Sequence, residues 1–130
     1  MTQAGLKIIS DAMETLGLNY GFGEYAVNSG EEVSYPYYVG EYEESEPFNE
    51  DGMQETLFMI TGFSRDTWQA LEEGKAKIRN YFNKVSGKTV IAEDGTAVAV
   101  FYSNSLIVPT GDAELKKIQI NLDIREWSVN

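Results

Sequence analysis

Six carboxylates are crowded into eleven residues of this chain: Glu41, Glu43, Glu44, Glu46, Glu50 and Asp51. Oxygen ligands at this density could bind calcium, and two such groups could share general acid and base roles. The spacing does not fit an EF-hand loop, because Asp51-Gly52 lacks the alternating ligands before it and the closing glutamate after it. Acid–base work would need a desolvated pocket, whereas a glutamate run beside a proline-containing loop is typical of a solvated surface. We therefore expect an acidic surface that selects partners.

The charge of the chain is divided between its two halves. Residues 8–64 contain 12 carboxylates and no lysine, arginine or histidine, whereas the residues from Arg65 onward contain nine acids and nine bases. The net charge of -11 therefore arises in the first half. A surface this negative repels nucleic acid and attracts basic partners.

Other catalytic machinery is not visible in the sequence. The chain has no histidine and no cysteine, which removes the usual general base, the thiol nucleophile and the commonest transition-metal ligands. No serine lies in a Gly-x-Ser-x-Gly turn, and Gly21 and Gly23 form only part of a dinucleotide fingerprint. The prediction is a protein without enzymatic activity, metal or cofactor.

Aromatic residues are concentrated in the same acidic half. Seven lie within 23 residues: Tyr20, Phe22, Tyr25, Tyr35, Tyr37, Tyr38 and Tyr42. Stacking platforms for single-stranded nucleic acid work inside basic grooves, and this stretch has no base. Tyrosine is enriched in protein interfaces, so we expect a role in strand packing and subunit contact. The candidate interface residues are Tyr35, Tyr37, Tyr38 and Tyr42.

Hydrophobic periodicity predicts two helices and six strands in one domain, residues 1–130. The helices are expected over residues 2–16 and 66–82, the second capped by Ser64 or Asp66, and the strands over residues 18–25, 33–44, 54–63, 89–92, 96–102 and 116–127. Residues 103–113 read as a connecting loop with a short extended piece, Leu106 to Val108, and Asp94-Gly95 reads as a hairpin turn. Because helices and strands do not alternate regularly, the expected fold is α+β, with a mainly antiparallel sheet of four to six strands and two helices packed on one face.

Composition predicts a soluble protein that does not enter a membrane. Mean hydropathy is -0.32, and the longest apolar run is Ala97 to Phe101. The N-terminal residues lack the features of a signal peptide and are better explained as an amphipathic helix. The lack of cysteine is in keeping with a reducing compartment.

Two phrases, YPYYVGEYEE and ETLFMITGFSRDTWQALEEGKAKIRNYF, follow a short N-terminal helix. This layout resembles the tail-terminator and tail-completion proteins of long-tailed phages, in which a strand ending in Phe/Trp-Ser-Arg leads directly into a helix. The resemblance covers about residues 5–82 and fades over residues 86–130.

The resemblance implies a subunit of a hexameric ring in the virion, at the head-proximal end of the tail, assembled in the host cytoplasm. Such a ring stops tube growth and joins the tail to the head. Its partners would be further copies of itself, the tail tube protein and the head connector protein, and DNA would pass through without specific binding. On this interpretation, the segment from Glu41 to Asp51 lines the lumen or faces a partner.

Two alternatives remain open on the residues alone. The same carboxylate density would suit an acidic DNA mimic or another protein-binding inhibitor, although a mimic should space its charges along an elongated face. A carboxylate–metal enzyme is the third reading, and saturable stabilisation by calcium or magnesium would reveal it.

Overall fold

The computed structural model describes residues 1–27, 30–44 and 52–127. This part of the chain forms two helices and six strands, whose bounds are α1 (Gln3–Thr15), β1 (Tyr20–Phe22), β2 (Tyr37–Glu44), β3 (Met53–Ser64), α2 (Trp68–Tyr81), β4 (Lys88–Ile91), β5 (Ala97–Ile107) and β6 (Lys116–Trp127). The element order is the predicted one.

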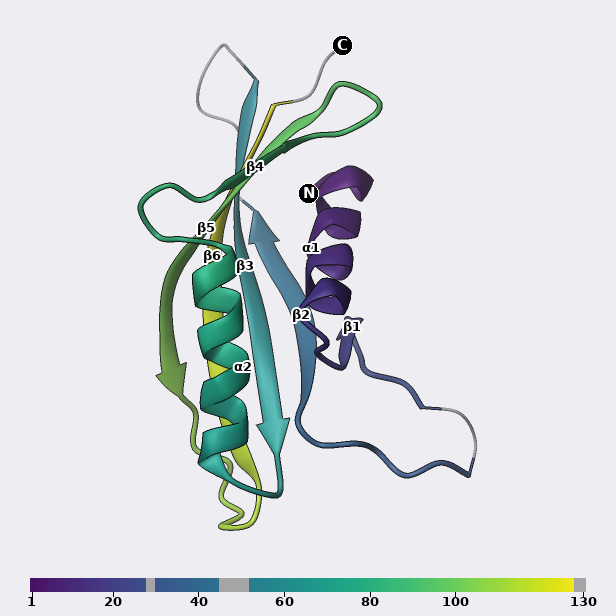
Figure 1. Cartoon of the computed structure of the whole chain (residues 1–130), viewed down its shortest axis with the longest axis vertical. Coiled ribbons are helices and arrows are strands. Elements are labelled where there is room, and N and C mark those ends of the chain that lie inside the picture. Colours follow the sequence, from purple (N-terminus) through teal and green to yellow (C-terminus); the bar gives the residue numbers. More distant parts are fainter. Residues whose placement is uncertain (28–29, 45–51, 128–130) are drawn as a thin grey trace.

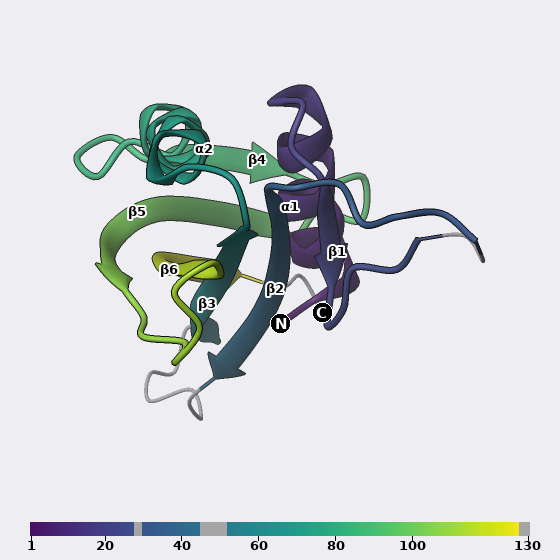
Figure 2. The ribbon, with the colours of Figure 1, turned by 90° about the horizontal axis from the view of Figure 1, so that it is seen from below.

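The six strands form one curled sheet in the order β1-β2-β3-β6-β5-β4 (Figure 1). The pair β1–β2 is parallel, and the other four pairs are antiparallel. Both helices lie on the same side of the sheet, as the view from below shows (Figure 2). The predicted α+β fold is therefore confirmed, with a sheet that is mixed because of its short first strand.

The core lies between the helices and one face of the sheet. Strands β3 and β6 are its centre, where Phe58 pairs with Leu122 and Ile60 pairs with Ile120, all fully buried. Ile9 and Met13 from α1 and Leu71 and Ile78 from α2 complete it. Burial of each such side chain stabilises the folded state by roughly 1.5–3 kcal/mol. Because the alternating apolar residues of β6 gain this energy only when they all face the core, their pattern in the sequence predicts the position of the strand.

The first turn of α1 is fastened to the end of β6 by a buried carboxylate. Glu126 is 1% exposed and accepts hydrogen bonds from the backbone N–H of Thr2, at 3.1 and 3.3 Å, and from the Thr2 hydroxyl. Thr2 is also the N-cap, and its Oγ1 accepts from the Gly5 N–H at 3.0 Å. A negative charge is favourable here because the helix N-terminus carries partial positive charge.

The second helix begins later than predicted. Its N-cap is Thr67, whose side chain accepts from the Ala70 N–H at 3.2 Å. Ser64 is instead the last residue of β3, paired with Lys116, and its Oγ accepts from the Asp66 N–H at 3.1 Å. The prediction of Ser64 or Asp66 as the cap is wrong because pairing with β6 extends β3 as far as Ser64.

The prediction of a loop over residues 103–113, extended only from Leu106 to Val108, is also wrong in part. Strand β5 continues to Ile107 after a register shift between Tyr102 and Asn104. The shift lets the weakly strand-forming Ser-Asn-Ser stretch stay paired with the long β6. Elsewhere the hairpin turn at Asp94-Gly95 is confirmed, with Gly95 at φ 90° and the Asp94 side chain accepting from the Thr96 N–H at 2.9 Å.

Candidate assembly surface

Three of the six predicted acidic residues lie in the described part of the chain. Glu41, Glu43 and Glu44 occupy the second half of β2, and all are exposed. Glu41 and Glu43 pair with Met59 and Leu57 and so belong to the sheet face that the helices leave uncovered, whereas Glu44 belongs to the other face. Glu46, Glu50 and Asp51 fall outside the described residues.

This acidic half of β2 is also an open strand edge. Strand β1 pairs only with Tyr38 to Gly40, and in the described ranges no other strand lies on that side of β2. The backbone from Glu41 to Glu44 is therefore free to pair with an added strand, and the charged side chains restrict what can be added. A basic extended segment fits both the edge and its charge.

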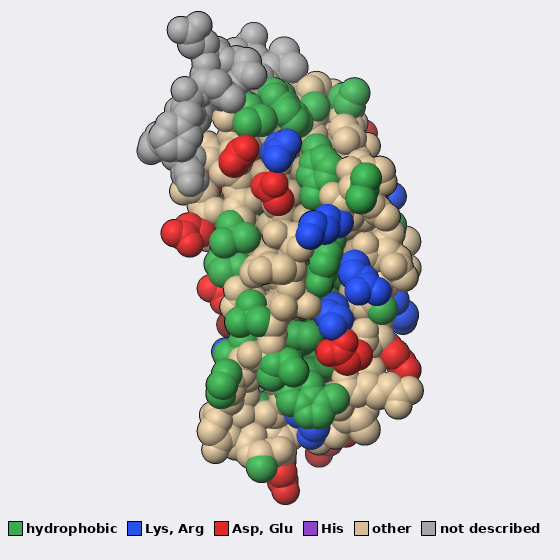
Figure 3. All heavy atoms as spheres, turned by 90° about the vertical axis from the view of Figure 1, so that its left-hand side faces the viewer, with side chains coloured by type: hydrophobic (Ala, Val, Ile, Leu, Met, Phe, Trp, Pro, Cys, Tyr) green, Lys and Arg blue, Asp and Glu red, His purple; other side chains and the backbone are tan. Residues whose placement is uncertain are grey.

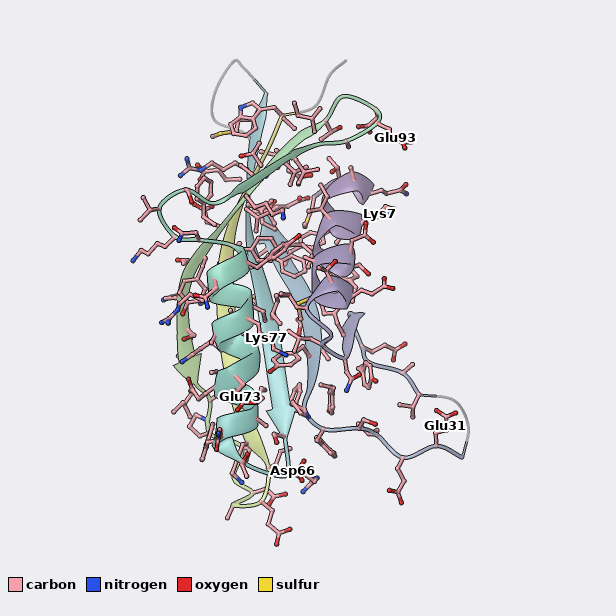
Figure 4. All side chains as sticks on the ribbon, in the orientation of Figure 1. Lys7, Glu31, Asp66, Glu73, Lys77 and Glu93 are labelled. Atoms are coloured by element: carbon pink, nitrogen blue, oxygen red, sulfur yellow. The ribbon has the colours of Figure 1, made fainter. Side chains whose placement is uncertain are left out.

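The division of charge along the sequence is also a division in space. The first-half elements α1, β1 and β2 lie together on the right of Figure 1, with α2 and β5 on the left. The left-hand side carries a band of lysine and arginine side chains with carboxylates among them (Figure 3). Glu31 stands on the connection that projects from the right-hand side, while Glu73 and Lys77 mix both signs on α2 (Figure 4). The two sides are thus electrostatically unlike.

An aromatic row crosses the uncovered face beside this edge. The Tyr37 ring stacks on Tyr25 with centroids 5.2 Å apart and on Phe63 with centroids 5.0 Å apart, and Tyr35 tilts against it at 5.5 Å. Lys117 of β6 places its ammonium 5.4 Å from the Phe63 centroid. The pKa of the Tyr37 hydroxyl is raised above its ordinary value, and burial is the largest cause. Period-two alternation along β3 could have assigned Phe63 to this row, because it shares a face with Thr61 and Met59.

The structure separates the four predicted interface tyrosines. Tyr35 and Tyr37 belong to the aromatic row, and Tyr42 is 37% exposed on the opposite face, where it stacks on Phe22 at 5.8 Å. Tyr38 is fully buried, so its assignment to an accessible subunit interface is corrected: its ring fills the space left by Gly62 and by Gly74 of α2. Burial raises the pKa of Tyr38 to about 12, which keeps its hydroxyl neutral.

Tyr35 is linked to the end of the β5–β6 connection through Arg65. The guanidinium donates to the Tyr35 hydroxyl and to Asp112 Oδ2, both at 3.3 Å, and the Asp112 Oδ1 accepts from the Glu114 N–H at 2.9 Å. These contacts lower the pKa of Asp112, the Glu114 hydrogen bond contributing most.

We predict a measurable pH effect at Asp112. A pKa that is lower in the folded than in the unfolded state contributes stability above the unfolded value, and this contribution is lost as the pH falls below about 4. Carboxyl NMR titration should give a depressed pKa for Asp112, and Arg65→Gln should raise it partway, since the Glu114 bond remains. An ordinary pKa in the wild-type protein would contradict this assignment.

The described residues contain no group of three or more acidic side chains placed to hold a metal ion. Neither of the two helices in the described ranges is long and apolar enough to cross a membrane.

The fold and this surface define an α+β protein with a charge-polarised sheet edge and an aromatic row beside it. No protein-family model and no curated protein matches the chain.

Proposed function

We propose that this chain is a structural virion assembly protein similar to phage tail terminators. Its copies form a ring that caps the tail tube and joins it to the head connector while DNA passes through. The role is architectural, and no catalytic step is assigned to it.

The observation that carries this proposal is that α1, β1 and β2, from the acidic half of the sequence, lie together on the right of Figure 1, whereas lysine and arginine side chains gather, with carboxylates among them, on the opposite side (Figure 3). Two unlike sides favour head-to-tail contacts between copies, because opposite charges attract and like sides repel. Head-to-tail contacts close into rings when the rotation between neighbours allows closure. The resemblance of residues 5–82 to tail terminators supports a hexamer.

Within such a ring we assign the acidic half of β2 to a surface that faces a partner. Its carboxylates and open backbone edge can accept a basic strand from the connector or tube protein. Tyr35, Tyr37 and Tyr42 supply aromatic area for contact between copies. Acidic groups facing the channel would let DNA slide without being retained, since retention comes from counterion release at lysine and arginine.

Light scattering tests the proposal directly. The protein is measured at several concentrations, alone and with the tail tube protein. We expect a closed oligomer of defined size that either forms alone or is induced by the tube protein. A strictly monomeric protein under every condition would contradict ring formation.

The partner-facing assignment yields a charge prediction. The double variant E41Q/E43Q should bind its assembly partner about tenfold more weakly at low salt, because two charge contacts are lost. Glu44 is left unchanged because its carboxylate pairs with the N-terminal ammonium of Met1. The matched control D66N/E93Q removes two exposed carboxylates elsewhere and should bind like the wild-type protein. Equal losses in both variants would show that net charge alone is responsible.

An acidic DNA mimic is the second candidate, favoured by the same exposed carboxylates. The described acidic residues Glu41, Glu43 and Glu44 cluster at one end of β2, whereas a mimic would space its charges along an elongated face. Capture from host lysate separates the two: tail or connector proteins support assembly, and a DNA-binding enzyme supports mimicry.

A further inference from the structure

A hollow of about 380 Å³ opens beside the aromatic row. Val39 and Thr61, which pair across β2 and β3, line its middle. Tyr37 lies two residues before Val39 on β2, and Glu41 two residues after it, so the hollow passes from an aromatic end to an acidic end. Its lining comes from the uncovered face of the sheet and from Gly23, Glu24 and Tyr25, which follow β1.

Two carboxylates border this hollow. Glu24 and Glu41 are exposed, and neither side-chain carboxylate makes a hydrogen bond or an ion pair with any other residue that the structure describes. The nearest base, Lys117, also borders the hollow but directs its ammonium to the Phe63 ring. The hollow is therefore bordered by two negative groups from different segments, whose charge no described base compensates by an ion pair.

We propose that this hollow binds the arginine side chain of an extended segment of another protein. The three methylenes of an arginine can lie on Val39 and the neighbouring tyrosine rings while the guanidinium reaches the carboxylates. Arginine suits the site better than lysine, because its planar fork of donors can bridge Glu24 and Glu41 with charge-assisted hydrogen bonds. Both the apolar and the charged part of the ligand are thus accounted for.

The extended form of the segment follows from the adjacent edge of β2. The Gly23 N–H donates to the Gly40 carbonyl at 2.8 Å, and beyond this bond the described chain has no strand beside Glu41 to Glu44. A strand added here would continue the line of β1 and carry its side chains past the hollow. Main-chain bonds would supply affinity, and the arginine would supply specificity.

The arginines of the chain itself favour an occupant from another protein. The sequence contains Arg65, Arg79 and Arg125. Arg65 is bonded to Tyr35 and Asp112, and Arg125 is paired with Asp123 and Glu55. Two of the three are thus engaged within their own subunit. The inference concerns a partner of the monomer and does not depend on ring formation.

The test uses the blocked peptide Ala-Val-Arg-Val-Ala and the same peptide with neutral citrulline in place of arginine. Binding to the full chain is followed by ¹H–¹⁵N NMR at low salt. We expect a Kd on the order of 1 mM for the arginine peptide, with shifts centred on Val39 and Thr61. Citrulline should weaken binding about tenfold, since the charge-assisted bonds are lost.

Protein variants complete a double-mutant cycle. The double variant E24Q/E41Q should weaken arginine-peptide binding about tenfold and no longer distinguish the two peptides. The control E32Q/E93Q removes two exposed carboxylates outside the hollow and outside β2, and should stay within about twofold of the wild-type protein.

Several results would overturn the proposal. These are equal binding of the two peptides, shifts centred elsewhere, equal loss in the control variant, or no binding at about ten times the expected Kd. Shifts in the hollow that appear on concentrating the protein without peptide, and vanish in E24Q/E41Q, would assign the site to a second copy of this chain instead.

Discussion

Replacing Gly74 by alanine should destabilise the protein by about 3 kcal/mol, although alanine is the better helix former by about 1 kcal/mol. A Cβ at this position of α2 would collide with the Tyr38 hydroxyl oxygen and lie 2.7 Å from Tyr38 Cζ. Tyr38 cannot move aside, because its ring is fully buried and already lies against Gly62. Chemical denaturation of the purified variant measures the effect.

Two further variants show that the collision is the cause. Asn80→Ala changes an exposed position of the same helix and should be neutral or stabilising by a few tenths of a kcal/mol. Tyr38→Phe removes a buried hydroxyl that has no hydrogen-bond partner among the described residues, and should change stability by less than about 1 kcal/mol. In the Tyr38→Phe background, Gly74→Ala should cost clearly less. If Gly74→Ala lowers the free energy of unfolding equally in both backgrounds, or if it stabilises the protein, the packing explanation is wrong.

Replacing Glu126 by alanine should cost about 2–3 kcal/mol and loosen α1 selectively. The substitution leaves the Thr2 N–H and hydroxyl without their acceptor in a largely buried place. It also removes the negative charge beside the helix N-terminus. Hydrogen exchange should therefore accelerate in α1 more than in α2, and denaturation gives the free energy.

The controls for this prediction vary charge and burial separately. Glu126→Gln keeps an oxygen acceptor for Thr2 and should fall between the wild-type protein and Glu126→Ala. Glu55→Ala removes an exposed carboxylate whose ion pair with Arg125 spans 3.8 Å, so its cost should stay below about 1 kcal/mol. If Glu126→Ala costs no more than Glu55→Ala, the carboxylate does not anchor α1.

Much of the fold could be predicted wherever one periodicity dominates. Strand β6 has the predicted bounds because Ile118, Ile120, Leu122 and Ile124 alternate without interruption and all face the core. The class of the sheet followed from the order of helices and strands. The parallel direction of β1 could not be read in the same way, since it depends on how the long connection to β2 returns.

The missed features depend on residues far apart in the sequence. The extension of β5 to Ile107 needs pairing with β6, because its Ser103 to Ser105 stretch has weak strand propensity. Tyr38 could not be separated from its aromatic neighbours until α2 and β3 were known to present Gly74 and Gly62 to it. A glycine that only weakens an isolated helix thus becomes necessary for packing in the fold.

The candidate site was predicted in its charge but not in its shape. Exposure of Glu41, Glu43 and Glu44 follows from their density and from their position at a strand end. The hollow that Glu41 shares with Glu24 has no sequence signature, because it forms only where β2, β3 and the end of β1 meet.

Zero-length carbodiimide cross-linking tests the central claim most directly, because it joins only carboxylates and amines that are already in contact. A mixture of ¹⁴N- and ¹⁵N-labelled copies is cross-linked in the presence of the tail tube and connector proteins, and the linked peptides are identified by mass spectrometry. The account predicts links from Glu41 or Glu43 to lysines of another polypeptide, whereas Glu44 should link to the N-terminal amine of its own copy, with which it pairs. Links confined to lysines of the same copy would contradict it.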